Sequence, residues 1–390
     1  MKRFVQLLAG AALITSALFS YPAAADKLPS GKGVVPLHPV VGKIIPGQYI
    51  VVLKDGATTD GPSVAASVGA QTTYIYNAAL NGFAAGLSDA ALATLQKNSN
   101  VAYIEPDQIM QADATQYMDG AGEPWGLDRI DQRNRPLSGS YTYNSTGTGV
   151  RAYIIDTGIQ TSHPEFGGRA SAVYDALGGN GQDCNGHGTH VAGTVGGSTY
   201  GVAKNAYLRA VRVLDCNGSG ATSGIIAGID WVRTNGIHPA VANMSLGGGY
   251  SASLNTAATN LANSGIFLAV AAGNENQDAC NVSPASAAGT FTTAASDRND
   301  TKASFSNFGS CVDGYAPGVA IKSSWLNSGT NTISGTSMAT PHVVGAAALY
   351  KSTYGDAASS TVVSWLINNA TANVISGNVG STPNRLLFRP

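Results

Sequence analysis

Charged residues are scarce in this chain of 390 residues, at 12% of the sequence, about half of the roughly 25% usual in soluble domains. Lysine and arginine number 22 and aspartate and glutamate 23, so neither sign is in excess. This balance excludes a nucleic-acid binder that relies on a strongly basic surface, and the chain has no acidic tail. The 44% of hydrophobic residues suffice for a sizeable core, and the length favours more than one domain.

Long uncharged apolar runs are missing after the first residues. Residues 1–25 combine two basic residues, an apolar run and a small-residue end at Ala23, Ala24 and Ala25, which predicts a secretory signal cleaved after Ala25. No later stretch reaches the roughly 18 apolar residues of a membrane span, so the mature protein is predicted to be soluble and extracellular. Export permits disulfides, but the four cysteines can pair in three ways and their spacing does not choose among them.

Two regions with different patterns follow the signal. Between about 45 and 110, GQYIVVLKDG and VAYIEPDQIM are typical of strands, and LSDAALATLQKN favours a helix capped by Ser88. The stretch QADATQYMDGAGEP is typical of a linker. From Trp125 onward, apolar runs such as GVRAYIIDTG and GIFLAVAAGN alternate with helical patterns. This alternation predicts an α/β fold, a mostly parallel sheet with helices on both faces, preceded by a small α+β domain.

Four polar residues stand where the predicted strands and helices meet. Asp156 ends one strand, Asn274 follows another, and His187 and Ser337 open helices. Each has an ordinary structural explanation, as a turn former, a strand cap, a polar helix start or, for Ser337, an N-cap. Ligands of parallel sheets gather at the carboxyl ends of the strands. An acid, a base, a hydroxyl and an amide at that edge therefore indicate chemistry.

The chemistry that needs these groups is nucleophilic attack by serine. A serine hydroxyl is a poor nucleophile until an imidazole takes its proton, and a buried carboxylate must hold that imidazole in one tautomer. The attacked carbonyl becomes an oxyanion, to which a side-chain amide such as that of Asn274 can donate. The amino end of the helix that Ser337 opens favours the same anion.

The segments IIDTGI, NGHGTHVAG, AAGN and SGTSMATPH, in this order, resemble the subtilisin-like serine proteases, and in particular their proteinase K-like branch. The resemblance implies Asp156, His187 and Ser337 as the catalytic triad and Asn274 in the oxyanion hole. It implies a secreted, monomeric serine endopeptidase that acts through an acyl-enzyme. Residues 26–113 resemble the family's propeptide, an intramolecular inhibitor and chaperone with its core at 45–110, and residues 114–390 resemble the catalytic domain. We expect the precursor to cut itself between Gln111 and Thr115.

Two glycine-rich segments, DCNGSGATS and NMSLGGGY, resemble the family's two substrate-binding segments. Bare backbone groups there let a peptide add as a strand, which predicts broad specificity with an apolar or aromatic preference before the cut. A plain turn is the alternative for Gly247, Gly248 and Gly249. The predicted substrate-binding residues are Gly218, Ser219, Gly220, Ser245, Leu246 and Gly247.

The resemblance also implies two disulfides, Cys184–Cys216 and Cys280–Cys311, and structural calcium. Asp128, Asp131 and Gln132 stand at i, i+3 and i+4, so one helical turn would bring three oxygen donors to one side. The matching residues of the family bind calcium. A second site there uses a carboxylate matching Asp313 and carbonyls matching Ala288 and Thr290, although Ala288 stands where fungal members have proline. Ordinary solvated acids are the alternative for Asp128 and Asp131.

Other enzyme classes lack their required residues here. An aspartic protease needs two carboxylates that share a proton, and no second D-[ST]-G accompanies DTG at 156–158. Zinc at Cys184, His187 and His190 would lack a further ligand cluster, and no H-E-x-x-H occurs. An α/β-hydrolase lipase or esterase would use G-x-S-x-G and the order serine, acid, histidine. A secreted binding module with a dead site should lack at least one of the four polar residues, and none is missing.

Overall fold

The computed structural model describes residues 34–40, 43–112, 115–116 and 124–390. The predicted signal sequence at 1–25 lies outside the described residues, as do residues 113 and 114 within the range of the predicted cut, Gln111 to Thr115. Val35–Pro390 forms one compact unit. Within the described ranges, no helix is both long enough and apolar enough to cross a membrane.

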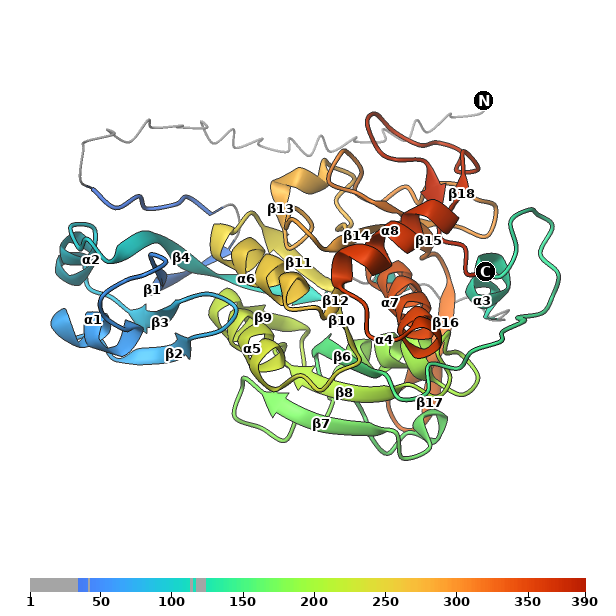
Figure 1. The fold of residues 1–390 in the computed structure, drawn as a ribbon, viewed down its shortest axis with the longest axis horizontal. Coiled ribbons are helices and arrows are strands. Elements are labelled where there is room, and N and C mark those ends of the chain that lie inside the picture. Colours follow the sequence, from blue (N-terminus) through green and yellow to red (C-terminus); the bar gives the residue numbers. More distant parts are fainter. Residues whose placement is uncertain (1–33, 41–42, 113–114, 117–123) are drawn as a thin grey trace, which may run out of the picture. The chain divides into compact units, whose positions relative to one another are not determined.

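The N-terminal part, residues 34–112, is a small antiparallel sheet with two short helices (Figure 1). Its central strand β1 (Lys43–Leu53) pairs with β3 (Gly82–Gly86) on one side and β4 (Val101–Ala112) on the other, and β2 (Thr72–Tyr76) pairs with β3. The helices are α1 (Gly61–Ser67) and α2 (Asp89–Leu95). Ser88 caps α2 by accepting the N–H of Ala91, as predicted from the sequence.

The C-terminal part, residues 124–390, is built on a nine-stranded sheet in the order β18-β19-β15-β14-β12-β10-β6-β8-β7. All neighbours pair in parallel except β18 and β19, so the mostly parallel sheet is confirmed. The strands are β6 (Arg151–Asp156), β7 (Ala170–Asp175), β8 (Tyr207–Arg212), β10 (Ala240–Met244), β12 (Phe267–Ala271), β14 (Phe291–Ser296), β15 (Gly314–Pro317), β18 (Thr371–Ala372) and β19 (Arg385–Leu386).

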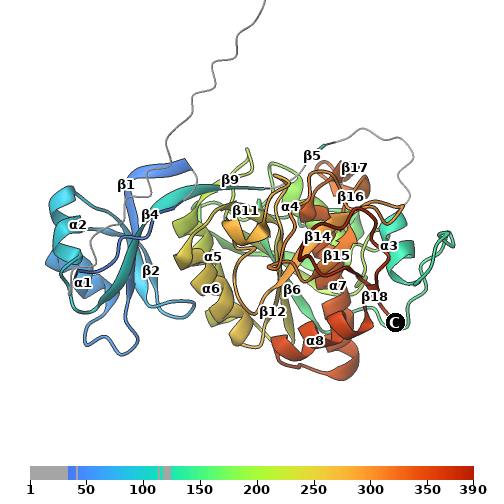
Figure 2. The ribbon, with the colours of Figure 1, turned by 90° about the horizontal axis from the view of Figure 1, so that it is seen from above.

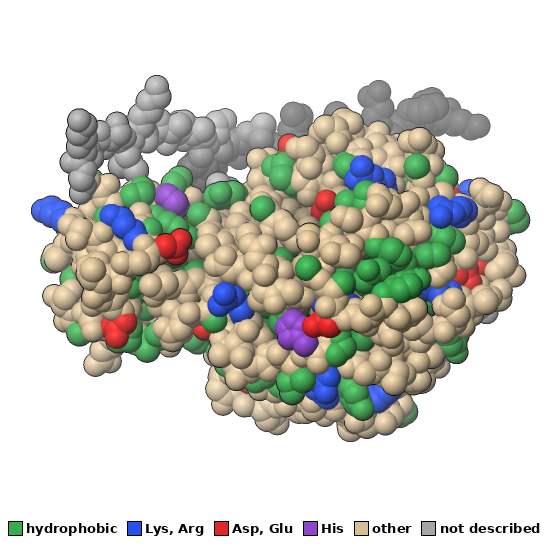
Figure 3. Space-filling model, in the orientation of Figure 1, with side chains coloured by type: hydrophobic (Ala, Val, Ile, Leu, Met, Phe, Trp, Pro, Cys, Tyr) green, Lys and Arg blue, Asp and Glu red, His purple; other side chains and the backbone are tan. Residues whose placement is uncertain are grey.

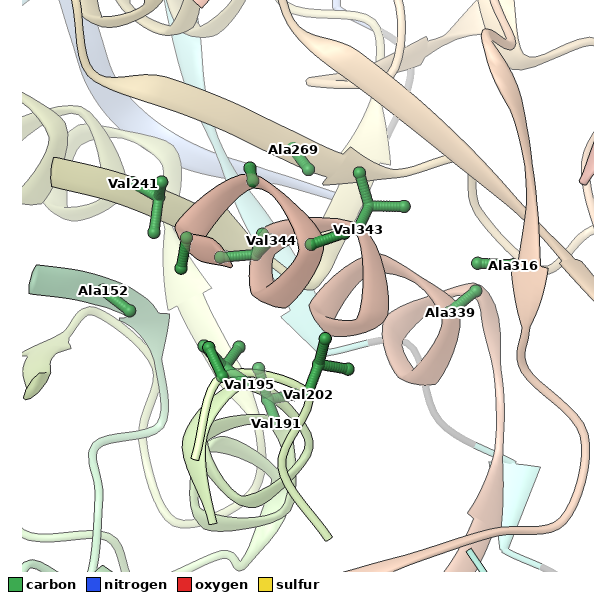
Figure 4. Close-up of a cluster of buried hydrophobic side chains, with 14 of the residues drawn as sticks. Ala152, Val191, Val195, Val202, Val241, Ala269, Ala316, Ala339, Val343 and Val344 are labelled. Atoms are coloured by element: carbon green, nitrogen blue, oxygen red, sulfur yellow. The ribbon is translucent and has the colours of Figure 1, made fainter. Parts of the chain in front are cut away.

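Helices cover both faces of this sheet (Figure 1; Figure 2). One face packs against α4 (His187–Gly196) and α7 (Thr336–Tyr354), and the other against α5 (Thr222–Asn235) and α6 (Ala252–Asn263). Successive residues of a strand point to opposite faces. Ile154 therefore packs in the hydrophobic cluster with α4 and α7, and Ile155 packs in the cluster with α5 and α6. Figure 4 shows Val343 and Val344 of α7 between the strands and α4.

Short elements surround the sheet. α3 (Trp125–Ile130) begins the C-terminal part and α8 (Ser359–Asn369) follows α7. The short strands are β5 (Thr115–Gln116), β9 (Ser219–Ala221), β11 (Leu246–Gly249), β13 (Val282–Ser283), β16 (Ile321–Trp325) and β17 (Gly329–Ser334), and the two 3-10 turns are η1 (Pro164–Phe166) and η2 (Ala279–Asn281). Figure 3 shows charged side chains scattered singly over one face, in keeping with the low charge content of the sequence.

Candidate active site

Asp156 and His187 meet at the carboxyl edge of the sheet. Asp156 is the last residue of β6 and His187 the first of α4, and both are buried. The Nδ1 atom of His187 lies 2.7 Å from Oδ1 of Asp156, which also accepts the N–H of Thr157 at 2.7 Å. A carboxylate in this position fixes the imidazole tautomer that leaves Nε2 able to accept a proton.

A second buried carboxylate, Asp183, anchors the start of α4. Its Oδ1 accepts from the Thr157 hydroxyl and from the N–H groups of Asn185 and Gly186, all at 2.9 Å. Its Oδ2 accepts from the N–H and the hydroxyl of Thr189. These bonds join the helix that carries His187 to the residue after Asp156. The sequence motifs did not single out Asp183, although an acid just before a helix start is a signal for such a contact.

Ser337 is the second residue of α7 and fully buried. Gly335 occupies the N-cap position and offers no side-chain cap, so the N-cap explanation of Ser337 is wrong. The Ser337 hydroxyl donates to the carbonyl of Ser245 at 3.2 Å, and the Ser245 hydroxyl donates to the carbonyl of Ser337 at 2.8 Å. Because α7 packs against α4, the helices that carry Ser337 and His187 are neighbours.

The amide of Asn274 is oriented by the residue before the serine. Its Oδ1 accepts from the N–H of Thr336 at 2.9 Å and from the Thr336 hydroxyl at 3.0 Å. The Thr336 hydroxyl in turn accepts the N–H of Gly273 at 3.1 Å. Because the amide oxygen of Asn274 accepts both bonds from Thr336, its NH₂ group is the one that can donate to a ligand.

The two predicted substrate segments flank a strand of the chain itself. The end of β4 runs antiparallel to β9, with Met110 opposite Gly220 and Gln111 opposite Ser219. It also runs antiparallel to β11, with Gln111 opposite Gly247 and Ala112 opposite Leu246. Gly218 directly precedes β9 at a φ of 76°, and Ser245 directly precedes β11. Gly247, Gly248 and Gly249 belong to β11, which overturns the plain-turn alternative.

The chain pairs again after residues 113 and 114. In β5, Thr115 lies opposite Ser334 and Gln116 opposite Ile333, so β5 adds to the edge of β17. β17 ends at Ser334, and Gly335 and Thr336 then lead into Ser337. The segment after the predicted cut therefore pairs with the strand that leads to Ser337, and the segment before it pairs with β11, which follows Ser245, a hydrogen-bond partner of Ser337.

Both predicted disulfides are present. Cys184–Cys216 ties the stretch before His187 to the loop before β9, with a Cα–Cα distance of 4.9 Å, and Cys280–Cys311 spans 5.3 Å. A bridged Cys184 cannot ligate zinc. Among the described residues, no group of three or more His, Cys, Asp or Glu side chains could hold a metal. Burial lowers the pKa of His190 to about 3, and its Nε2 contacts the carbonyl of Ile321.

The first set of predicted calcium ligands gathers around one loop. α3 ends at Ile130, so Asp131 and Gln132 lie beyond the helix, unlike the single turn predicted. Even so, Asp128 accepts the N–H of Ser138 at 2.9 Å, Gln132 accepts the same N–H at 3.0 Å, and Asp131 accepts that of Thr142 at 2.5 Å. Asp128 is buried, which is unlike an ordinary solvated acid.

The second set lies at the amino ends of β14 and β15. The Asp313 carboxylate accepts the N–H of Thr292 at 2.8 Å, and the N–H of Asp313 donates to the carbonyl of Thr292. Thr290 is buried, whereas Ala288 is exposed. Burial raises the pKa of Asp313 to about 6, and the N–H of Thr292 and the charge of Arg385 offset only part of this desolvation.

Comparisons with known proteins agree with this geometry. The model of the subtilase family matches residues 147–385, and that of the peptidase inhibitor I9 family matches residues 48–113. The chain is 51% identical to an extracellular serine proteinase of Thermus sp. (strain Rt41A), over 89% of this chain and 90% of that protein. It is 42% identical to proteinase R of Parengyodontium album, over 94% of this chain and 95% of that protein.

A solved structure gives the same result. The crystal structure of a cold adapted subtilisin-like serine proteinase matches with a TM-score of 0.67 and 53% identity, over 68% of this chain and 98% of that one. The predicted family and fold are thus confirmed. The chain belongs to the subtilase family of serine proteinases and carries an I9 inhibitor propeptide ahead of its catalytic domain.

Proposed function

We propose that the chain is the precursor of a secreted serine endopeptidase in which Ser337 is the nucleophile, His187 the general base and Asp156 the residue that orients it. Ser337 Oγ attacks the substrate carbonyl and gives its proton to His187, which returns it to the leaving amine. The acyl-enzyme is then hydrolysed by water through the same groups. The contact between Asp156 and His187 Nδ1 at 2.7 Å supports these roles.

Asn274 serves as the oxyanion donor in this proposal. Thr336, the first residue of α7, donates its N–H and its hydroxyl to the amide oxygen of Asn274, so the amide NH₂ is preorganised next to Ser337. A donor that needs no reorientation during the reaction stabilises the developing charge more than one that must turn. The N-terminal end of α7 adds a favourable dipole for the same anion.

One observation carries the proposal: the chain's own strand occupies the substrate segments. β4 pairs with β9 and β11, and β5 pairs with β17. A substrate bound by these edges would use the same main-chain pairing, which favours broad specificity. The pairing also supports self-cutting between Gln111 and Thr115, at the proposed boundary between residues 26–113 and 114–390. The released propeptide, whose last strand pairs with β9 and β11, then acts as an inhibitor.

Calcium is proposed as a structural ion at the Asp128, Asp131 and Gln132 set. The Oδ1 atom of Asp131 is buried and has no hydrogen-bond partner among the described residues, and burial raises the pKa of this carboxyl. A hard cation that prefers oxygen donors suits such a group. Asp313, with the carbonyls of Ala288 and Thr290, is proposed as a second set, and the buried carboxyl of Asp313 supports it. Calcium there would stabilise the fold and take no part in peptide hydrolysis.

The test is to express the precursor with Ser337→Ala in a host that lacks other secreted proteases. We expect no hydrolysis of casein and a propeptide that remains covalently attached. Circular dichroism should show the same fold as wild type, since the lost hydroxyl makes one hydrogen bond, to Ser245. Removal of the propeptide from this variant, or residual casein hydrolysis, would contradict the proposal.

A further inference from the structure

Two carboxyl groups of β4 lie on the amino ends of two helices of the C-terminal part. Glu105 accepts the N–H of Ser253 at 3.0 Å with Oε2 and the hydroxyl of Ser251 with Oε1. Asp107 accepts the N–H of Ser223 at 2.9 Å with Oδ1. Ser223 is the second residue of α5 and Ser253 the second of α6. Such N–H groups have no acceptor inside their own helix.

The donors belong to the C-terminal part and remain after the propeptide leaves. The N-cap of α5 is Ala221, which has no side-chain acceptor, so Asp107 completes that helix end. In α6 the hydroxyl of Ser253 is fully buried and has no hydrogen-bond partner among the described residues. Without Glu105 and Asp107, both helix ends lack an acceptor for these N–H groups.

Recognition at these helix ends works through N–H and hydroxyl groups. Among the residues that the structure describes, neither Glu105 nor Asp107 forms an ion pair. Burial raises the pKa of both carboxyl groups, while the bonds from Ser251, Ser253 and Ser223 lower it. The helix dipoles favour negative charge at the same two places. The serines and the helix ends therefore offset part of the desolvation of the two carboxylates.

We propose that the mature enzyme keeps the amino ends of α5 and α6 as an exosite for acidic residues of extended protein substrates. The inference rests on the proposed self-cutting function. Counted back from Asp113, Asp107 is the seventh residue and Glu105 the ninth. A substrate with carboxylates at these two positions would satisfy both helix ends while its reactive bond lies at Ser337.

The continuity of β4 explains why a substrate would reach the exosite. The same strand that bears Glu105 and Asp107 continues into the pairing of Ile109 with Ala221 and of Gln111 with Gly247. Between these parts, the hydroxyl of Thr222 donates to the carbonyl of Gln108 at 3.0 Å, which holds the strand against the start of α5. A substrate that adds between β9 and β11 in this register passes over the two helix ends.

The test uses mature wild-type enzyme and fluorogenic peptides with the sequence of residues 103–116. The native peptide, one with Glu105→Ala and Asp107→Ala, and one with Glu105→Gln and Asp107→Asn are compared by kcat/KM. We expect the native peptide to exceed the alanine peptide by about 10-fold or more, since charge-assisted hydrogen bonds are lost, with the amide peptide in between. Equal values for the native and alanine peptides overturn the exosite, and equal values for the native and amide peptides overturn its assignment to acids.

Enzyme variants locate the effect. Ser223→Pro and Ser253→Pro each delete one donating N–H at a position where the first helical turn tolerates proline, and each should move the native-to-alanine ratio toward one. Ser360→Pro, at the second position of α8, is the matched control and should keep the wild-type ratio. If the native-to-alanine ratio of kcat/KM keeps its wild-type value in both variants, the proposal is wrong. If a variant does not mature, the comparison of the three peptides with wild-type enzyme decides. Failure to cut any peptide would instead contradict the proposed endopeptidase function.

Discussion

The N-terminal and C-terminal parts of the precursor are stabilised by different kinds of contact. Both disulfides lie in the C-terminal part, as do the described ion pairs, including the buried Arg129–Asp300 pair at 2.6 Å. The N-terminal part contains no cysteine, and its described residues form no ion pair. The disulfides and ion pairs are therefore concentrated in the part that is proposed to remain after the propeptide is cut off.

The N-terminal sheet divides its apolar faces between two partners. Val51 and Phe83 pack in one cluster with α1 and α2 of the same part. Ile50 and Val52 join a cluster that contains Ile225 and Ile226 of α5 in the C-terminal part. One apolar face of the sheet thus packs against a neighbour from which the sheet is proposed to separate. Once separated, the N-terminal part would expose this apolar face to water, which would lower its stability.

The largest effect should come from Asp156→Asn, because the imidazole of His187 would lose the acceptor that fixes its tautomer. We expect kcat/KM for a peptide substrate to fall by about 10⁴-fold. The two parts would then stay joined in a full-length precursor, so the stability of each part could be measured in the same molecule. Gel electrophoresis measures cleavage of the precursor, and a peptide hydrolysis assay measures kcat/KM. Thermal unfolding is the control for an intact fold. Normal processing would contradict the assigned role of Asp156.

The second largest effect should come from loss of a disulfide, which should destabilise the C-terminal part alone. Cys280→Ala with Cys311→Ala opens a loop of sequence separation 31 and should lower the free energy of unfolding of the mature enzyme by about 3 kcal/mol. Phe83→Ala, a buried residue of the N-terminal part, is the matched comparison. It should impair processing of the precursor and leave the inactivation rate of the mature enzyme unchanged. Equal effects of both changes on the mature enzyme would contradict the division of roles.

The third largest effect should come from removal of calcium. An ion that binds only the folded state stabilises it by about 2.7 kcal/mol at a hundredfold excess over Kd, so EDTA should sharply speed thermal inactivation of the mature enzyme. Calcium should restore the slow rate and zinc should not, because the proposed ligands are oxygens. Asp131→Ala should abolish the response to EDTA at the first site. Inactivation that is indifferent to chelation in both wild type and variant would remove calcium from the proposal.

Local sequence patterns predicted the elements that carry the candidate site, since strand ends and helix starts are set by nearby residues. The apolar run before Asp156 and the small-residue helix after Ser337 form β6 and α7. The helical turn predicted to hold Asp128, Asp131 and Gln132 is incomplete, because α3 ends at Ile130. Asp128 and Asp131 nevertheless bind the same loop, because Ser138 and Thr142 donate their backbone N–H groups to them. Periodicity cannot anticipate such a return of the chain.

Contacts between distant segments were beyond sequence reasoning. Thr336 binds Asn274 across more than sixty positions, and Glu105 reaches Ser253 across nearly one hundred and fifty. Such pairs are chosen by the packing of helices on the sheet, and neither residue carries a local mark of its partner. Asp183 illustrates the intermediate case, because an acid near a helix start is common, and only the fold shows it joined to Thr157 beside Asp156.

The smallest predicted effect concerns one ion-pair cluster of the C-terminal part. Lys351 is almost fully buried, and its Nζ donates to the carbonyl of Gly265 and to Oδ1 of Asp356, both at 2.7 Å. Burial tends to raise the pKa of Asp356, but Lys351 and the ring of His238 lower it by more, so the net pKa lies below its usual value. A carboxyl group with a lowered pKa in the folded state stabilises the fold at a pH above the usual aspartate pKa. This contribution is lost as the pH falls through the lowered pKa of the folded state.

Asp356→Asn should therefore lower the free energy of unfolding by about 1 kcal/mol at pH 7, since the Asp356 side chain is 36% exposed and solvent screens part of the pair. The difference from wild type should shrink as the pH falls from about 5 toward 3, where the wild-type carboxylate also becomes protonated. Urea unfolding in the Asp156→Asn background measures this without self-digestion. His238→Ala is the matched control and should have the smaller effect, because its ring is more exposed than the ammonium of Lys351. A difference that stays constant from pH 7 to pH 3 would show that Asp356 acts through packing and not through its charge.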